Sequence, residues 1–368
     1  GQHKEAIQLL QQALATSPND RNVHDNLGWE YYRLAKPIFS QDNINTFQAK
    51  KILSDYIRLE NERPSILHSL FLRFADKLVG SNDFNLVSFL QYWNLNNLRE
   101  EDYERFVADD GKSFPSIAEK VIQHGAKDAL NSNNLDHADY ILPFVDSLII
   151  RFSENQWLTY YKAKLLNAIG KHEEAVVFSI KVVKTKPNDF WTWGLLGSIL
   201  SHININEAFS CYCRALSCRT DDKFLTGLRV EFAELLIKNK NFSEAKFEID
   251  NAIIAREREG WKIPESLSRF QQADWYKNSE EIRSNKFFYS KNLELANSLL
   301  FKDLEWLNAV VGESFSIPEK PGKPKRKLYI QINKHQDPIE IVVPENKYGF
   351  AKLKQGAGLK LKGEYDAQ

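Results

Sequence analysis

The chain has 368 residues, 43% of them hydrophobic and 12% aromatic, so it can bury a sizeable core and is not an intrinsically disordered protein. Its 49 Lys and Arg balance 49 Asp and Glu, and its three cysteines are too few for a disulfide framework. Because no apolar run approaches the roughly 20 residues of a membrane span and no charged-then-apolar leader opens the chain, we expect a cytoplasmic protein without membrane contact.

Residues 1–63 predict the start of an array of helix pairs. The first residues have the spacing of the second helix of a repeat, and the first helix of that repeat is missing. The positions that show this spacing are Ala6, Leu10, Ala13 and Pro18. Leu27, Gly28 and Tyr31 then provide the large, small and aromatic positions of a new first helix. A repeat of about 34 residues therefore begins near residue 27.

Residues 64–150 are helical by their apolar spacing but fit that repeat poorly, so we interpret them as divergent helical repeats. The apolar positions at the start are Ile66, Leu67, Leu70, Phe71 and Phe74. Residues 109–116 predict a polar loop, and Ser116 is the expected N-cap of a helix that begins near Ile117.

Residues 151–310 contain the clearest repeats. Between Trp157 and Asp189 the expected intervals are occupied by Ala163, Gly170, Ala175, Val182 and Pro187. Two further copies follow, with their marker positions at Trp193, Leu196, Gly197, Leu200, Ala208, Ala215, Ala245 and Ala252. After them, residues 287–307 form an amphipathic stretch that predicts a capping helix.

These residues resemble the tetratricopeptide repeat (TPR) family. The resemblance implies a mainly α fold, a solenoid of antiparallel helix pairs whose small residues let the helices approach closely. It also implies a concave surface, lined by the first helices, that receives a peptide or a partner helix. Polar side chains beside the packing positions are the candidate partner-binding residues: Asn26, Arg33 and Lys162.

The composition changes near residue 311. Prolines and lysines predict a basic linker over 311–327, followed by a partial β-rich domain over 328–368 with alternating strands around residues 328–332 and 339–343. Residues 320–368 carry eleven Lys and Arg against five Asp and Glu, whereas residues 1–319 carry 38 against 44. The neutral chain therefore has a basic end.

Residues 347–352 resemble the aromatic nucleic-acid-binding strand of cold-shock and related OB barrels, in which aromatics stack on bases and lysines meet phosphates. The matching positions and the basic linker give the candidate nucleic-acid-binding residues: Lys323, Lys325, Arg326, Lys327, Lys347, Tyr348, Phe350 and Lys352. A solvated tether explains the linker equally well, and a barrel core or edge strand explains the two aromatics. Fewer than the roughly 70 residues of a barrel follow the linker, so we expect a truncated one.

Together, the repeats, the loop at 111–116, the helical middle and the basic end resemble the TPR proteins of bacterial TOTE conflict systems. That resemblance implies an accessory, nucleic-acid-linked role in defence against invasive DNA, with a protein or peptide partner and single-stranded DNA or RNA. It implies no catalytic activity.

Signatures of catalysis and of metal binding are weak in this sequence. Gly111-Lys112-Ser113 lacks the earlier glycine of a phosphate-binding loop, since Phe106 stands there. The cysteines 211, 213 and 218 have the wrong helical spacing for zinc and are expected in the core. We therefore expect no enzyme, no metal and no cofactor.

Three interpretations remain open. The first is an adaptor that holds a protein in the TPR groove and nucleic acid on the basic end. The second is a purely protein-binding solenoid whose end domain is structural or dimerising. The third is an enzyme with a site near Asp109, Asp110 and Lys112, which no recognised constellation supports.

Overall fold

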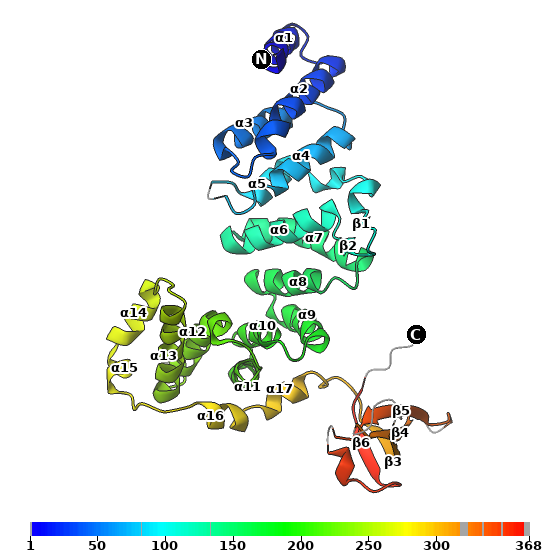
Figure 1. The fold of residues 1–368 in the computed structure, drawn as a ribbon, viewed down its shortest axis with the longest axis vertical. Coiled ribbons are helices and arrows are strands. Elements are labelled where there is room, and N and C mark those ends of the chain that lie inside the picture. Colours follow the sequence, from blue (N-terminus) through cyan, green and yellow to red (C-terminus); the bar gives the residue numbers. More distant parts are fainter. Residues whose placement is uncertain are drawn as a thin grey trace. The chain divides into compact units, whose positions relative to one another are not determined.

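The computed structural model describes residues 2–81, 83–132, 134–316, 323–332, 335–346 and 349–363. The chain divides into two compact units, Gly1–Asn292 and Leu293–Gln368 (Figure 1). The first unit is helical and the second contains a small antiparallel sheet. The expected mainly α fold with a small β-rich end is confirmed.

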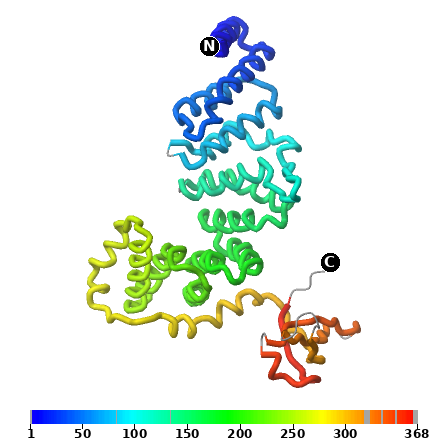
Figure 2. Tube along the Cα trace, in the orientation of Figure 1, coloured from blue at the N-terminus to red at the C-terminus, as the bar shows by residue number. Residues whose placement is uncertain are grey.

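The first unit is an array of helices that pack against their neighbours in sequence order (Figures 1 and 2). The helices are α1 (Gln2–Thr16), α2 (Arg21–Phe39), α3 (Thr46–Ile57), α4 (Ile66–Asp76), α5 (Leu86–Trp93), α6 (Ile117–Ser132), α7 (Leu135–Arg151), α8 (Gln156–Ala168), α9 (His172–Thr185), α10 (Phe190–Leu200), α11 (Ile205–Leu216), α12 (Asp222–Lys238) and α13 (Phe242–Arg258). Short turns join α8 to α9, α10 to α11 and α12 to α13, which makes three consecutive TPR-like pairs.

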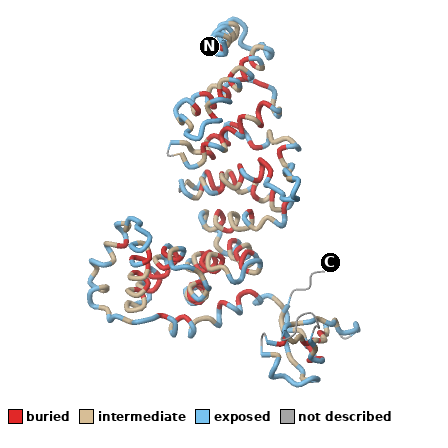
Figure 3. The backbone as a smooth tube through the Cα atoms, in the orientation of Figure 1, coloured by how far each residue is buried: buried red, intermediate tan, exposed pale blue. Residues whose placement is uncertain are grey.

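Small and aromatic repeat positions form the contacts within these pairs. Ala163, Ala175 and Ala208 are fully buried, and a Cβ on Gly197 would lie 3.1 Å from the Tyr212 ring. Trp193 is buried and its indole nitrogen donates a hydrogen bond to the carbonyl of Pro187, 2.8 Å away. The buried residues lie on the sides of the helices that face one another (Figure 3), so stacking supplies the core that a single pair lacks.

Residues 94–116 depart from helical repeats. Two short 3-10 helices, η1 (Leu95–Asn97) and η2 (Glu100–Tyr103), lead into a hairpin of β1 (Phe106–Val107) and β2 (Ser113–Phe114). The predicted polar loop is therefore the turn and second strand of a hairpin. The predicted N-cap is confirmed, because Ser116 Oγ accepts a hydrogen bond from the Glu119 amide at 3.1 Å and Glu119 accepts one from the Ser116 amide at 3.0 Å.

The first unit ends in three short helices, and a buried carboxylate holds the last of them. They are α14 (Glu265–Gln272), α15 (Asp274–Asn278) and α16 (Lys286–Lys291). Glu248 of α13 is fully buried and accepts hydrogen bonds from Arg229 at 2.6 Å, Asn285 at 2.6 Å and the Tyr289 hydroxyl. The predicted long capping helix over 287–307 does not form. Two six-residue helices, α16 and α17 (Glu294–Leu299), and then a strand occupy that stretch.

The second unit is built around a four-stranded antiparallel sheet. Its strands are β3 (Leu307–Phe315), β4 (Lys325–Gln331), β5 (Ile339–Pro344) and β6 (Gly358–Leu361), in the order β5-β4-β3-β6, with a 3-10 helix η3 (Phe350–Lys352) between β5 and β6. The predicted linker over 311–327 is therefore shorter than expected, because strands take both of its ends. The residues of that stretch that the structure does not describe are 317–322.

One face of this sheet is apolar and buried. Its core residues are Ala309 and Val311 of β3 with Leu328 and Ile330 of β4, and the two strands pair Ala309 with Ile330 and Val311 with Leu328. The alternation that predicted a strand at 328–332 is therefore explained by a sheet with one buried face and one face open to solvent. Across the described parts of the chain, none of the helices has the length and apolarity that crossing a bilayer requires.

Candidate functional site

The second face of the sheet carries aromatic, apolar and basic side chains, and we call it the open face. Strand alternation and the register place on it Asn308, Val310, Lys325, Lys327, Tyr329, Gln331, Glu340, Val342, Gly358 and Lys360. Because side chains of a strand alternate between faces, this set is determined by the buried set on the same strands.

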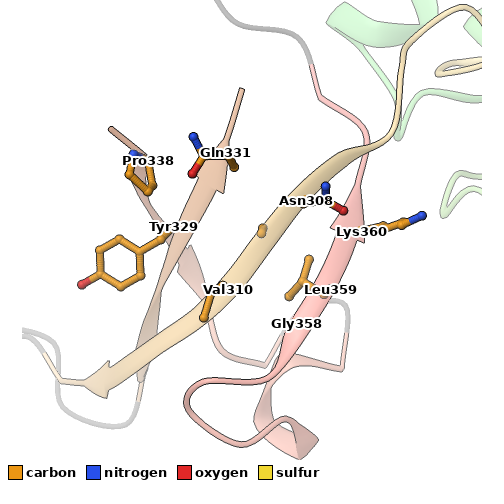
Figure 4. Close-up of a pocket in the computed structure, with 9 residues that line it drawn as sticks. Asn308, Val310, Tyr329, Gln331, Pro338, Gly358, Leu359 and Lys360 are labelled. Atoms are coloured by element: carbon orange, nitrogen blue, oxygen red, sulfur yellow. The ribbon is translucent and has the colours of Figure 1, made fainter. Parts of the chain in front are cut away.

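A hollow of about 490 Å³ lies on the open face (Figure 4). Tyr329 of β4 stands directly opposite Val310 of β3, and Val310 is opposite Gly358 of β6. Gly358 has no side chain, so the surface beside Val310 stays low next to the tyrosine ring. This combination forms an apolar platform of the kind on which a planar group stacks.

A polar row crosses the sheet beside that platform. Asn308 of β3 lies opposite Gln331 of β4 on one side and Lys360 of β6 on the other. The Gln331 side chain donates a hydrogen bond to the carbonyl of Gln336 at 2.7 Å. Asn308 and Lys360 are exposed, so an amide and an ammonium group are available two residues along the strands from the platform.

The charge of the open face is mainly positive, and two carboxylates lie next to one of its lysines. Lys327 lies 3.0 Å from Glu313 and 3.4 Å from Glu340, and its hydrogen bond to Glu313 together with the Glu340 charge raises the pKa of its ammonium. The Lys327 ammonium is therefore already paired with carboxylates of the sheet. Among the described residues, Lys325 and Lys360 are the open-face cations that form no ion pair.

A second exposed aromatic precedes the sheet. Trp306, 63% exposed, comes directly before β3, and the Lys362 ammonium lies 5.2 Å from its ring centroid. Lys362 also donates a hydrogen bond to the carbonyl of Phe301 at 2.9 Å. By alternation Trp306 falls on the same side as Asn308, so it extends the aromatic surface of the open face.

Arg326, one of the predicted phosphate-binding residues, lies on the other side of β4 and is buried. Its Nε donates to Glu345 at 3.0 Å and its Nη1 donates to the carbonyl of Leu353 at 2.9 Å. Hydrogen bonds from Ser314 and Arg326 lower the pKa of the Glu345 carboxyl. The prediction for Arg326 is corrected, because a guanidinium held this way joins strands instead of meeting phosphate.

The other predicted nucleic-acid residues are not brought together. Lys323 and Lys352 are exposed, and Phe350 and Lys352 belong to η3, which follows Gly349 at φ 75°. The described part of the predicted aromatic strand over 347–352 is thus a 3-10 helix and not a strand, which removes the alternation on which that prediction depended. Lys347 and Tyr348 lie outside the described residues.

Two of the predicted partner-binding residues lie on exposed helix faces and one does not. Asn26 and Arg33 are exposed on α2, where Arg33 pairs with Glu30 at 2.5 Å. The Lys162 ammonium instead pairs with Asp146 at 2.7 Å and lies 3.9 Å from the Phe178 ring centroid. Lys162 therefore stabilises the packing of helices in the array, and its assignment to a partner surface is corrected.

Two groups of aromatic side chains were not among the predicted site residues. Tyr329 belongs to the alternation that predicted β4, and an aromatic at an outward strand position is itself a signal of binding. Trp157, Tyr160 and Trp191 of the first helices α8 and α10 form a partly exposed aromatic cluster. Trp157 and Trp191 occupy the same position of successive repeats, and that recurrence could have identified them.

The weak catalytic signals have structural explanations. Cys211 and Cys213 are fully buried, and burial raises the pKa of both thiols, which disfavours the reactive thiolate. Lys112 pairs with Asp110 at 2.8 Å in the exposed hairpin turn. Within the described ranges no group of three His, Cys, Asp or Glu is placed to hold a metal ion.

Comparisons with known proteins describe this chain only in part. A model of a domain of unknown function (DUF7017) matches residues 156–296, from α8 into α17. No curated protein matches the sequence.

Several solved helical-repeat structures resemble it. A tetratricopeptide repeat protein from Parabacteroides merdae ATCC 43184 is 11% identical, covers 80% of this chain and 92% of its own, and has a TM-score of 0.39. MamA of strain MSR-1 is 13% identical, with 59% and 99% covered and a TM-score of 0.32. Human IFIT1, solved as a dimer with m7Gppp-AAAA, is 13% identical, with 81% and 66% covered and a TM-score of 0.39. Similarity at this level is not evidence of a shared activity or ligand.

Proposed function

We propose that this protein is a non-enzymatic adaptor that binds a protein partner on the first helices of its repeats and single-stranded nucleic acid on the open face of its C-terminal sheet. The observation that carries the proposal is the open face itself, where Tyr329 and Val310 form a platform on the same side of the sheet as Lys325 and Lys360. Sequence resemblance to the TPR proteins of conflict systems supports a place in bacterial defence.

Stacking and charge make this face suited to single strands. An unpaired base can stack on an aromatic side chain, and such contacts are worth about 1–3 kcal/mol per base. Lysines beside the ring can meet the flanking phosphates, whose contribution falls as salt rises. Bases in a duplex are already stacked on their neighbours, so a platform of this size favours unpaired ones.

The topology of the sheet supports an OB-like interpretation. Strands β3, β4 and β5 form a meander, η3 follows, and β6 returns to pair with β3. An OB barrel begins with the same arrangement and binds its ligand on the face of its second and third strands. Tyr329 lies on β4, the second strand of this sheet.

The test is fluorescence anisotropy of the whole protein with short labelled single-stranded DNA and RNA at about 50 and 200 mM salt. We expect affinity to fall steeply with salt and Tyr329→Ala to weaken binding about tenfold at both concentrations, because one base loses its stacking surface. Lys325→Ala with Lys360→Ala should lower the salt slope by about one per lost phosphate contact.

Two controls define the outcome. Tyr329→Phe keeps the ring and should keep the affinity, and Tyr92→Ala removes a 73% exposed tyrosine of the first unit and should change nothing. The absence of oligonucleotide binding at low salt would overturn the nucleic-acid proposal. It would leave the purely protein-binding solenoid with a structural end domain. Binding that is insensitive to Tyr329→Ala would place the contact elsewhere.

A further inference from the structure

A short segment of the first unit, residues 285–292, docks onto helices α11, α12 and α13, and we call it the latch. It contains α16, which packs against α11 (Figure 1). Its contacts with these helices are made by Asn285, Phe288, Tyr289 and Asn292. These positions are i, i+3, i+4 and i+7, the spacing with which an amphipathic helix of one protein binds in a groove of another. The latch therefore resembles a bound peptide that the chain itself supplies.

The polar anchors of the latch converge on one carboxylate. Glu248 of α13 is fully buried and accepts hydrogen bonds from the Asn285 side chain at 2.6 Å and from the Tyr289 hydroxyl. Its other oxygen accepts from Arg229 of α12 at 2.6 Å. Hydrogen bonds to a charged acceptor are about twice as strong as those between neutral groups. Glu248 is therefore the main polar contact that the helices offer to the latch.

The apolar anchor of the latch meets aromatic rings of two helices. The ring centroid of Phe288 lies 6.4 Å from that of Phe209 on α11 and 6.4 Å from that of Phe232 on α12. At the end of the latch, the carbonyl of Asn292 accepts a hydrogen bond from the Ser210 hydroxyl of α11. Helices α11, α12 and α13 thus provide a carboxylate, aromatic rings and a hydroxyl for a ligand of about two helical turns.

The latch fits these helices incompletely. In the part of the chain that the structure describes, Arg229 Nε and Asn285 Oδ1 are buried and have no hydrogen-bond partner. A buried polar atom without a partner offsets much of what the neighbouring hydrogen bonds contribute. A helix of six residues is not stable by itself, and residues 280–284 before it form no helix or strand. The latch can therefore leave without the unfolding of another helix of the first unit.

We propose that α11, α12 and α13 form a peptide-binding groove, that the latch fills it as an internal ligand, and that a partner helix displaces the latch. The partner carries the same anchors, which are a side-chain amide, a phenyl ring and a phenol at positions i, i+3 and i+4. This inference goes beyond the proposed function, because α11 and α13 are second helices of their pairs. Since the latch is tethered, its effective concentration is high, and the partner binds weakly to the intact chain.

A terminal cap of the array is the alternative explanation for the latch. Caps of repeat arrays present a polar outer face, whereas the outward ring of Phe287 is 81% exposed. The latch also contacts the pair α10–α11 as well as the last pair, α12–α13. Both observations favour a bound ligand over a simple cap.

The test uses the whole protein and a labelled synthetic peptide with the sequence of residues 283–293, in fluorescence anisotropy. A latch variant combines Asn285→Ala, Phe288→Ala and Tyr289→Phe, which removes the anchors and leaves the groove intact. We expect it to bind the peptide at least about tenfold more tightly than wild type, because the latch no longer competes. Tyr289→Phe alone, which removes one donor to Glu248, should increase the affinity about two- to fivefold.

Phe287 provides the matched control, because it is the neighbouring ring on the exposed side of the same helix. Phe287→Ala in the protein should leave the peptide affinity at its wild-type value, and the same change in the peptide should not alter its binding to the latch variant. Phe288→Ala in the peptide should weaken that binding about tenfold, as should Phe209→Ala in the groove. Circular dichroism of each variant shows whether it is folded.

Equal peptide binding by wild type and the latch variant would overturn the inference, because the peptide would then not compete with the latch. A folded latch variant that binds no peptide would overturn it as well. So would a latch variant that unfolds, since residues 285–292 would then be a fixed part of the core. If the peptide fails while oligonucleotide binding still depends on Tyr329, the inference fails and the nucleic-acid half of the proposed function stands.

Discussion

Burial sets the protonation state of His68 on α4. Its Nε2 lies 2.9 Å from the carbonyl of Trp93, which only accepts, so Nε2 carries the proton and Nδ1 accepts from the Tyr56 hydroxyl at 3.1 Å. Its ring stacks on Trp93 at 4.1 Å. Because the side chain is fully buried, desolvation lowers the pKa of His68 to about 4.

This depressed pKa predicts a loss of stability in mild acid. The unfolded chain takes up the proton as the pH falls through the ordinary value of about 6.5, whereas the folded protein takes it up only near 4. The contribution is complete above pH 6.5 and is lost as the pH falls toward 4, by up to about 3 kcal/mol. Urea unfolding of wild type and His68→Phe between pH 7 and 4.5 measures it.

The phenylalanine variant isolates the histidine from other titrating groups. It is expected to be less stable than wild type at pH 7, because Tyr56 and the Trp93 carbonyl lose their partner. The stability difference should shrink as the pH falls, since only wild type loses the histidine contribution. Two parallel stability curves would contradict the buried neutral imidazole.

At the scale of the element, the repeats depend on how closely two helices approach. Gly28 on α2 marks such a contact, because a Cβ there would lie 2.9 Å from Leu67 and 2.9 Å from the Asn61 amide nitrogen. Asn61 is held by hydrogen bonds to the His24 carbonyl at 2.8 Å and to Asp25 at 3.0 Å, so it cannot move aside without loss. The small residue that identified the repeat is therefore a steric requirement.

Gly28→Ala and Gly227→Ala should shift stability in opposite directions. The first is expected to destabilise by about 1–3 kcal/mol through overpacking. The second places a Cβ where no atom lies within 4 Å, and in α12 it should stabilise by about 0.5–1 kcal/mol through helix propensity. Denaturant unfolding of both variants checks this, and equal effects would contradict the packing at Gly28.

Prediction of elements succeeded where a local signal is strong. The helix after Ser116 and the pairs between residues 156 and 258 follow from capping and repeat spacing. The hairpin at 106–114 was missed because strands of two residues show no periodicity. The capping helix over 287–307 was wrong, because apolar spacing alone does not reveal that Leu307 begins a strand.

At the scale of the whole molecule, the chain consists of two compact units, Gly1–Asn292 and Leu293–Gln368. The first unit has its own core and the network around Glu248 at its end, and the second has its own half-buried sheet. The charge asymmetry follows a similar division, with the basic excess in residues 320–368. The two proposed binding sites are thus carried by different units.

A fragment of residues 1–292 is therefore expected to fold by itself. Its helical melting transition, followed by circular dichroism, should match that of the whole protein, because no core residue of the first unit is removed. It should lose oligonucleotide binding, because the open face of the sheet belongs to the second unit. An unfolded fragment, or one that still binds oligonucleotides through the same salt-sensitive contact, would contradict this division.

Spacing along the chain was enough to predict the helix pairs, the N-cap at Ser116 and the basic end, because each depends on residues close in sequence. The environment of individual side chains was not predictable in this way. In the sequence, Arg326 is one of several cations in a lysine-rich stretch. Only the pairing of strands buries it against Glu345. Lys162 likewise turns inward to Asp146. Which side of an element faces water depends on contacts between distant segments, and those contacts turned Tyr329 into a candidate binding residue and Arg326 into a structural one.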